Sequence, residues 1–141
     1  MKLGEVLNKF LNGKSILIVD DEEKIRDLIG TYLRKANFDC ESLVGAADGA
    51  EAIRKINNQE FGLIIVDIVL PRRNGLEVFK ELRSKAKTKN IPVLIISGNL
   101  NSSIVKKAIF LGAKHILTKP FKYDVFIERL SRCLGLEVQN L

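Results

Sequence analysis

The amino-acid sequence predicts a single doubly wound α/β domain built on a five-stranded parallel sheet. Five short segments rich in β-branched and aliphatic residues recur along the chain, and a segment with helical spacing of apolar residues follows each of them. This alternation favours right-handed strand–helix–strand crossovers. Three of the five segments are continuously apolar, which is typical of strands that helices cover on both faces.

The expected strands occupy residues 15–19, 40–44, 63–66, 92–96 and 114–117. The second is more polar than the others and therefore fits an edge strand. About two extra residues near 43–46 indicate a longer loop after that strand.

Helical spacing of apolar residues covers segments 25–33, 52–56, 76–82, 104–109 and 126–134. Polar residues that favour helix N-caps precede or begin these segments: Asp20 or Asp21, Asp48, Asn74, Asn101 and Asp124. Gly112 stands where a helix ends and the chain turns back towards the sheet.

An additional helix is expected at residues 2–11, before an Asn12-Gly13 stop. Its helically spaced apolar residues are Leu3, Val6, Leu7, Phe10 and Leu11. Packing on its own domain is the simpler interpretation, and a partner-binding or dimerising helix is the alternative. The chain therefore divides into an N-terminal amphipathic helix (1–13), one domain (14–134) and a C-terminal tail (135–141).

Composition excludes several classes of protein. With 46% hydrophobic and 28% charged residues, the chain is ordinary for a soluble globular domain, and no apolar run reaches the roughly 20 residues of a membrane span. We expect no membrane insertion. Two cysteines without a CxxC pair and the lack of a signal peptide favour the cytoplasm. The +6 charge is spread along the chain without an aromatic platform, so direct nucleic-acid binding is not expected.

Charged and polar residues follow four of the five strands. Asp20 and Asp21 follow the first, Asp67 the third, Ser97 the fourth and Lys119 the fifth. Residues beyond the carboxyl ends of parallel strands converge on one crevice. Charged side chains seldom lie beside buried strands without a partner or a role. We therefore expect these side chains to form one site.

Three clustered carboxylates repel one another unless a cation neutralises them, and a hard divalent ion such as Mg²⁺ suits oxygen ligands and phosphate. An ionised Asp67 could then act as a nucleophile, with Lys119 neutralising phosphoryl oxygens and Ser97 donating a hydrogen bond to one of them. Phosphoryl transfer needs mainly positioning and charge stabilisation, which these residues can supply.

The order and spacing of several motifs resemble the receiver domain of bacterial response regulators in two-component signalling. The matching motifs are Ile18-Val19-Asp20-Asp21, Asp48-Gly49-Ala50-Glu51-Ala52, Val66-Asp67-Ile68-Val69-Leu70-Pro71, Asn74-Gly75-Leu76-Glu77, Ile96-Ser97-Gly98, Gly112-Ala113 and Leu117-Thr118-Lys119-Pro120-Phe121. The resemblance spans almost all of residues 14–134. Within the family, the chain is similar to the stand-alone chemotaxis-type receivers. It implies a flavodoxin-like topology with strand order 2-1-3-4-5.

The resemblance also implies roles for individual residues. Asp67 matches the phosphoacceptor, and Asp20 and Asp21 match the acidic pair that binds Mg²⁺ together with it. The backbone carbonyl of Val69 matches the third protein ligand of the metal.

Two further residues match the family's catalytic positions. Ser97 matches the hydroxyl residue that moves towards the phosphoryl group, and Lys119 matches the essential lysine. The Lys119-Pro120 bond is expected to be cis.

The sequence also departs from the family pattern. The family usually has an aromatic residue three positions before the lysine, where it couples phosphorylation to the output surface. In this chain that position is Ile116, preceded by His115, and either could take over the coupling role. Arg72-Arg73 follows Pro71, where a solvated loop and a site for phosphate or an acidic partner are both open. The apolar Val69 cannot orient an attacking water, so we expect a phosphoryl group that persists.

The leading interpretation is a phosphorylation switch, charged by a histidine kinase or phosphotransfer protein, that catalyses only its own Mg²⁺-dependent phosphorylation and dephosphorylation. Little sequence follows Leu134, so we expect the signal to pass to an unknown downstream protein, unless the chain is a fragment of a longer one. A dimer that forms on phosphorylation is also compatible with the sequence. The alternative is a receiver-like interaction module that is never phosphorylated. An aspartate-based hydrolase is disfavoured because Val69 occupies its general-acid position, and no GxGxxG motif supports nucleotide binding.

Overall fold

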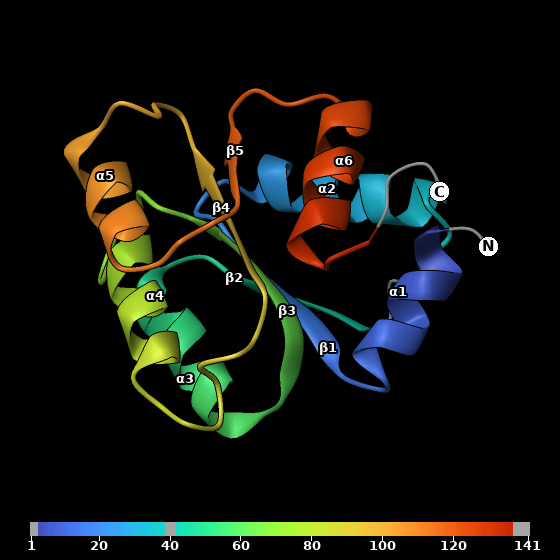
Figure 1. The fold of residues 1–141 in the computed structure, drawn as a ribbon, viewed down its shortest axis with the longest axis horizontal. Coiled ribbons are helices and arrows are strands. Elements are labelled where there is room, and N and C mark those ends of the chain that lie inside the picture. The colour runs from blue at the N-terminus through green and yellow to red at the C-terminus, as the bar shows by residue number, and fades with distance from the viewer. Residues whose placement is uncertain (1–2, 39–41, 137–141) are drawn as a thin grey trace.

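The computed structural model describes residues 3–38 and 42–136. Its centre is a five-stranded parallel sheet in the predicted order β2-β1-β3-β4-β5, with β2 and β5 at the edges (Figure 1). The strands are β1 (Ser15–Val19), β2 (Leu43–Ala46), β3 (Phe61–Asp67), β4 (Val93–Ser97) and β5 (Ile116–Thr118). The doubly wound fold predicted from the alternation of segments is confirmed.

Within the described part of the chain, the following α-helices cover the sheet: α1 (Leu3–Leu11), α2 (Glu23–Lys35), α3 (Gly49–Asn58), α4 (Gly75–Arg83), α5 (Ser103–Phe110) and α6 (Tyr123–Cys133). Helices α3, α4 and α5 pack on one face, and α1, α2 and α6 pack on the other (Figure 1). Side chains alternate along β1, so Leu17 belongs to the first core and Ile16 to the second. Among the described residues, none of these helices has the length and apolar character needed to cross a bilayer.

The second strand differs from the prediction. It was expected at residues 40–44 with a longer loop near 43–46, but the strand itself is Leu43–Ala46, which pairs with Ile16–Val19 of β1. Residues 39–41 lie outside the described residues. Gly45 in the middle of the strand obscured it, because glycine is depleted in strands. The predicted edge position is correct.

Two of the predicted N-caps are confirmed. The side chains of Asp48 and Asn74 accept hydrogen bonds from backbone amides in the first turns of α3 and α4, at 2.8 and 3.0 Å. The predictions for α2, α5 and α6 were wrong by one or two residues, because the N-caps are Glu22, Ser102 and Lys122. Of these three, only Ser102 makes a side-chain capping bond.

Helix α1 packs on its own domain, as the simpler interpretation predicted. Its buried residues are Leu3, Gly4, Leu7 and Leu11. The Gly4 amide donates a 2.7 Å hydrogen bond to the carbonyl of Ala36 at the end of α2. A Cβ at Gly4 would lie 2.2 Å from the carbonyl of Asn37, so only glycine permits this approach.

The packing of α1 predicts a stability effect. Replacing the fully buried Leu7 with alanine should lower the free energy of unfolding by about 2–5 kcal/mol, because it leaves a cavity in the core. Urea denaturation measures this, with the exposed Lys9→Ala on the same helix as the matched control. Equal stabilities of the two variants would contradict the packing of α1 on the domain.

Candidate functional site

The predicted site residues meet at the carboxyl edge of the sheet. Asp20 follows β1, Asp67 ends β3, Ser97 ends β4 and Lys119 follows β5. Here the domain carries an open cleft of about 410 Å³. The cleft is lined by Asp21, Glu22, Asp67, Val69, Ser97, Gly98, Asn99, Ser102 and Lys119.

An ammonium group holds the site together. Lys119 Nζ lies 2.6 Å from Asp67 Oδ2 and 2.8 Å from Asp20 Oδ2, and 3.5 Å from Glu22 Oε1. Asp20 and Asp67 are both buried, with 0% and 6% of their surfaces exposed. Lys119 therefore supplies a counter-charge to two carboxylates that would otherwise be costly to bury.

These contacts shift the pKa values of both partners. Burial alone would lower the pKa of the Lys119 ammonium, but its contacts with Asp20 and Asp67 outweigh burial and raise that pKa. Burial raises the pKa of the Asp67 carboxyl, although the hydrogen bond from Lys119 opposes the change. Burial and the lysine therefore act on the pKa of Asp67 in opposite directions, and a further cation at the site would favour the ionised carboxylate.

Backbone amides fix the remaining carboxylate oxygens. Val69 N donates a 3.0 Å hydrogen bond to Asp67 Oδ1, and Glu22 N donates a 2.9 Å bond to Asp20 Oδ1. Each carboxylate is therefore bound by a turn two residues downstream on one oxygen and by the lysine on the other. The orientation of Asp67 is set before any ligand arrives.

The Ser97 hydroxyl lies in the cleft but is engaged locally. Its Oγ donates to the carbonyl of Asn99 at 3.0 Å and accepts from the Asn99 amide at 3.1 Å. The Lys119 amide donates to the Ser97 carbonyl at 2.8 Å, which ties the ends of β4 and β5 together. The Lys119-Pro120 bond that follows is cis, as predicted.

Two glycines allow the loop after Asp67 to fold tightly. A Cβ on Gly75 would lie 2.3 Å from the Asp67 carbonyl oxygen, and a Cβ on Gly49 would lie 1.5 Å from the carbonyl oxygen of Arg73. Arg72 and Arg73 themselves have left-handed φ values of 45° and 60°. Backbone strain is therefore concentrated beside the site, where it is held by this close packing.

The donor set suits a hard divalent cation. Carboxylate oxygens of Asp20, Asp21 and Glu22 lie within 4.8 Å of one another. Asp20 Oδ2 is buried and lies near Lys119 Nζ, yet it makes no well-aligned hydrogen bond among the described residues. Oxygen ligands with excess negative charge favour Mg²⁺, so these residues fit such an ion.

Three residues of the site were missed or misplaced by sequence reasoning. Glu22 lines the cleft beside Lys119, and its signal was its place directly after Asp20-Asp21. Ser102 was passed over for Asn101. Asn99 was not predicted to contact Ser97, although its backbone binds the Ser97 hydroxyl. No sequence pattern announces that backbone contact.

Comparison with known families matches residues 16–131 to the response regulator receiver domain. The chain belongs to this family. Membership of this receiver family supports phosphorylation-dependent two-component signalling as the function of the domain, and no observation favours a receiver that is never phosphorylated.

Curated relatives of the receiver domain are regulators. The transcriptional regulatory protein GltR of Pseudomonas aeruginosa is 32% identical over 123 residues, which are 87% of this chain and 50% of GltR. The Regulator of RpoS of Escherichia coli is 37% identical over 112 residues, 79% of this chain and 32% of that protein. The chain thus spans half or less of these relatives.

Solved structures agree with the fold of the receiver domain. The chemotaxis response regulator CheY4 of Vibrio cholerae superimposes with a TM-score of 0.74 at 30% identity, covering 85% of this chain and 98% of CheY4. The receiver domain of the sensor histidine kinase PA1611 of P. aeruginosa gives a TM-score of 0.75 at 26% identity, covering 87% and 98%. That structure has a magnesium ion coordinated in its active-site cleft.

The ion pairs at the site predict a pH-dependent loss of stability. At neutral pH and without divalent cations, Lys119→Met should lower the free energy of unfolding by about 2–3 kcal/mol. Breaking a fully buried ion pair costs roughly 3–5 kcal/mol, and we expect less here because the lysine is partly exposed. Without the ammonium, the pKa of the Asp67 carboxyl rises further in the folded state, because burial is then opposed by less positive charge. The stability of the variant therefore falls as pH rises through the carboxyl range, and its deficit shrinks towards acidic pH.

Urea titrations of the wild type and the variant between acidic and neutral pH, in a chelating buffer, measure this deficit. The exposed Lys114→Met, at the other end of β5, serves as the control and should lie within about 0.5 kcal/mol of the wild type. A deficit that does not change with pH would show that lost packing, rather than lost charge, causes it.

Proposed function

We propose that this receiver domain is a phosphorylation-dependent signalling switch in which Asp67 accepts the phosphoryl group. The observation that carries the proposal is the pairing of Asp67 with Lys119 at the base of an open cleft rich in carboxylates. Asp67 Oδ2 and the ammonium are 2.6 Å apart, and both line the cleft, where an incoming phosphate can reach them.

In the proposed reaction, a carboxylate oxygen of Asp67 attacks the phosphorus of a phosphohistidine on a histidine kinase or phosphotransfer protein. A P–O bond forms to Asp67, and the donor's P–N bond breaks, with its electron pair returning to the imidazole. Lys119 then neutralises a phosphoryl oxygen in place of the carboxylate charge. In-line transfer of this kind depends mainly on positioning and charge stabilisation.

We assign the metal site to Asp20, Asp21, Asp67 and the backbone carbonyl of Val69. A bound Mg²⁺ would supply positive charge that lets Asp67 stay ionised and screens the phosphoryl oxygens. Asp67 is presented for this by the Val69 amide, which holds one of its oxygens. Glu22 lies near enough to Lys119 to remain paired with the ammonium while phosphate is bound.

Ser97 is the proposed switching residue. Its hydroxyl can exchange the Asn99 carbonyl for a phosphoryl oxygen, which would draw residues 97–102 towards Asp67. That loop leads directly into α5, so the face formed by α5, β5 and α6 would change with it. A downstream protein would recognise the change at that face. We place this activity in the cytoplasm.

The switch predicts covalent modification at one residue. Incubation with Mg²⁺ and a small phosphodonor such as acetyl phosphate should add a single phosphoryl group, seen by intact-mass spectrometry. Asp67→Asn should abolish the addition, whereas the exposed Asp27→Asn on α2 should not change it. Chelation of Mg²⁺ should suppress the addition in the wild type. Undiminished phosphorylation of Asp67→Asn would refute the assignment.

The side chain at position 69 predicts the lifetime of the phosphoryl group. Val69 lines the cleft with 60% of its surface exposed and offers no polar atom beyond its backbone. Val69→Asn should speed hydrolysis several-fold to about tenfold, equivalent to roughly 1.4 kcal/mol of barrier, because its amide can orient the attacking water. Val69→Ala is the control, and decay is followed by mass spectrometry after the donor is removed. Equal decay rates for all three proteins would contradict this role.

A further inference from the structure

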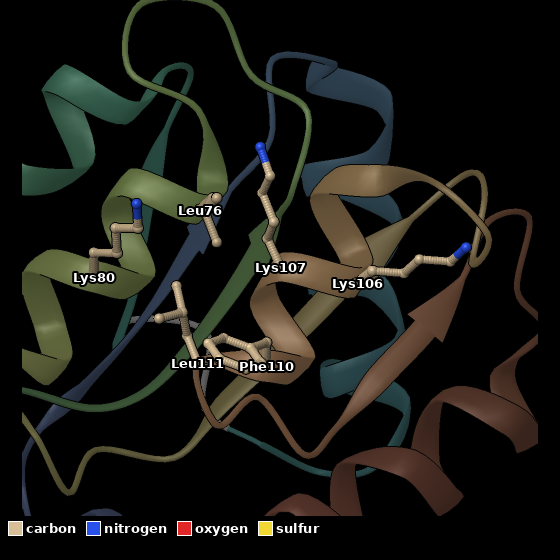
Figure 2. A pocket seen from close by; sticks show the side chains of 6 residues that line it. All are labelled: Leu76, Lys80, Lys106, Lys107, Phe110 and Leu111. Atoms are coloured by element: carbon tan, nitrogen blue, oxygen red, sulfur yellow. The ribbon is translucent and has the colours of Figure 1, made fainter.

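A second hollow, separate from the phosphorylation cleft, lies between α4 and α5. Its volume is about 340 Å³, which lies within the range of ligand pockets and is large enough to receive an aromatic side chain of a partner. Figure 2 shows its lining, with Leu76 and Lys80 on α4, and with Lys106, Lys107 and Phe110 on α5 and Leu111 directly after it. The lining residues are Leu76, Lys80, Lys106, Lys107, Phe110 and Leu111.

Apolar side chains gather at the α5 side of this hollow. Phe110 is 90% exposed, and its neighbours Ile109 and Leu111 are 53% and 42% exposed. Leu76, which is 7% exposed, forms part of the apolar lining contributed by α4. Phe110 and Leu111 line the hollow and Ile109 adjoins them in sequence, and exposed large apolar residues grouped in this way beside a concavity favour an interaction site.

The cations around the hollow also lack partners. Lys80, Lys106 and Lys107 are exposed, and none forms a salt bridge among the described residues. Elsewhere, cations such as Lys55 and Lys85 pair with a glutamate on the adjacent helical turn. Helix α5 contains no acidic residue at all. Its positive charge is therefore available to an acidic partner.

We propose that the hollow between α4 and α5 docks a segment of a partner protein in which an apolar or aromatic anchor is flanked by Asp or Glu. The anchor would fill the hollow against Leu76 and Phe110, and the flanking acids would pair with Lys106 and Lys107. Electrostatic complementarity of this kind speeds association and selects partners, while the buried anchor provides most of the affinity.

Other occupants fit the surface less well. A second copy docked through the same face would bring the lysines of both chains together, and each chain already carries a formal charge of +6. A lipid surface would attract the lysines and accommodate Phe110, but a flat surface would not fill the hollow. An acidic protein segment uses both features.

The inference deepens the proposed function and rests on it for the link to phosphorylation. Helix α4 begins at Gly75, whose amide donates to the carbonyl of Ile68 next to the phosphoacceptor Asp67. Helix α5 begins after residues 97–102, which lead from Ser97. The α5 wall of the hollow is therefore connected to the loop that the switch would move, and the α4 wall to the loop that follows Asp67.

The test selects peptides that bind the unphosphorylated full chain from a random phage-displayed library. We expect enriched sequences with an aromatic or large aliphatic residue between acidic residues. Their affinity, measured by fluorescence anisotropy, should fall at least about tenfold in Phe110→Ser and in the double variant Lys106→Glu/Lys107→Glu. The exposed Val125→Ser on α6 and the exposed pair Lys9→Glu/Lys24→Glu are matched controls and should bind like the wild type.

Four results would overturn the inference: no enrichment, enriched peptides without acidic residues, full binding by Phe110→Ser, or loss of binding in the controls. Co-sedimentation with phosphatidylglycerol vesicles or a dimer in ultracentrifugation, either one lost in Phe110→Ser, would instead assign the surface to lipid or to a second copy. Intact-mass phosphorylation of Phe110→Ser separates the two proposals. Normal phosphorylation without peptide binding refutes only the docking site, and peptide binding without phosphorylation refutes only the switch.

Discussion

The ammonium of Lys119 lies between two buried carboxylates, and the arrangement of the whole site depends on that contact. Asp20 and Asp67 come from the ends of different strands, and each would be costly to bury as an isolated anion. One lysine, held by the turn after β5, offsets both. The same contact leaves a net negative site beside an open cleft, so a cation and a phosphate can bind there and redistribute the charge. The arrangement of the site and its proposed chemistry therefore depend on the same balance of charge.

The sheet makes this arrangement rigid. Helices cover both faces of the sheet, and the apolar side chains of the central strands are buried against them. The core therefore fixes the positions where those strands end. Close approaches at Gly49 and Gly75 bind the loop after Asp67 to its surroundings. The Ser97 hydroxyl, by contrast, is bound among the described residues only by the backbone of its neighbour Asn99. Rigid carboxylates beside a locally bonded hydroxyl suit a switch in which one loop moves and the site stays in place.

Much of this could be predicted from the sequence, because continuous apolar strands and the polar residues that follow them are local signals. The five residues of the strand ends were expected together, and the structure brings Asp20, Asp67 and Lys119 into contact. The edge strand β2 was misplaced because Gly45 interrupts its pattern. The Ser97–Asn99 hydrogen bonds and the hollow beside Phe110 were not predicted. They depend on backbone geometry and on the packing of two helices, which residue spacing does not encode.

The most direct measurement of the central claim is a crystal structure of the chain grown with Mg²⁺ and beryllofluoride, which mimics an acyl phosphate. We expect beryllofluoride bonded to a carboxylate oxygen of Asp67 and contacted by Lys119. We also expect a metal ion bound by Asp21, Asp67 and the Val69 carbonyl, and a Ser97 hydroxyl turned from Asn99 towards the fluorides. Beryllofluoride bound elsewhere, or a metal ion that does not contact Asp67, would refute the proposed site.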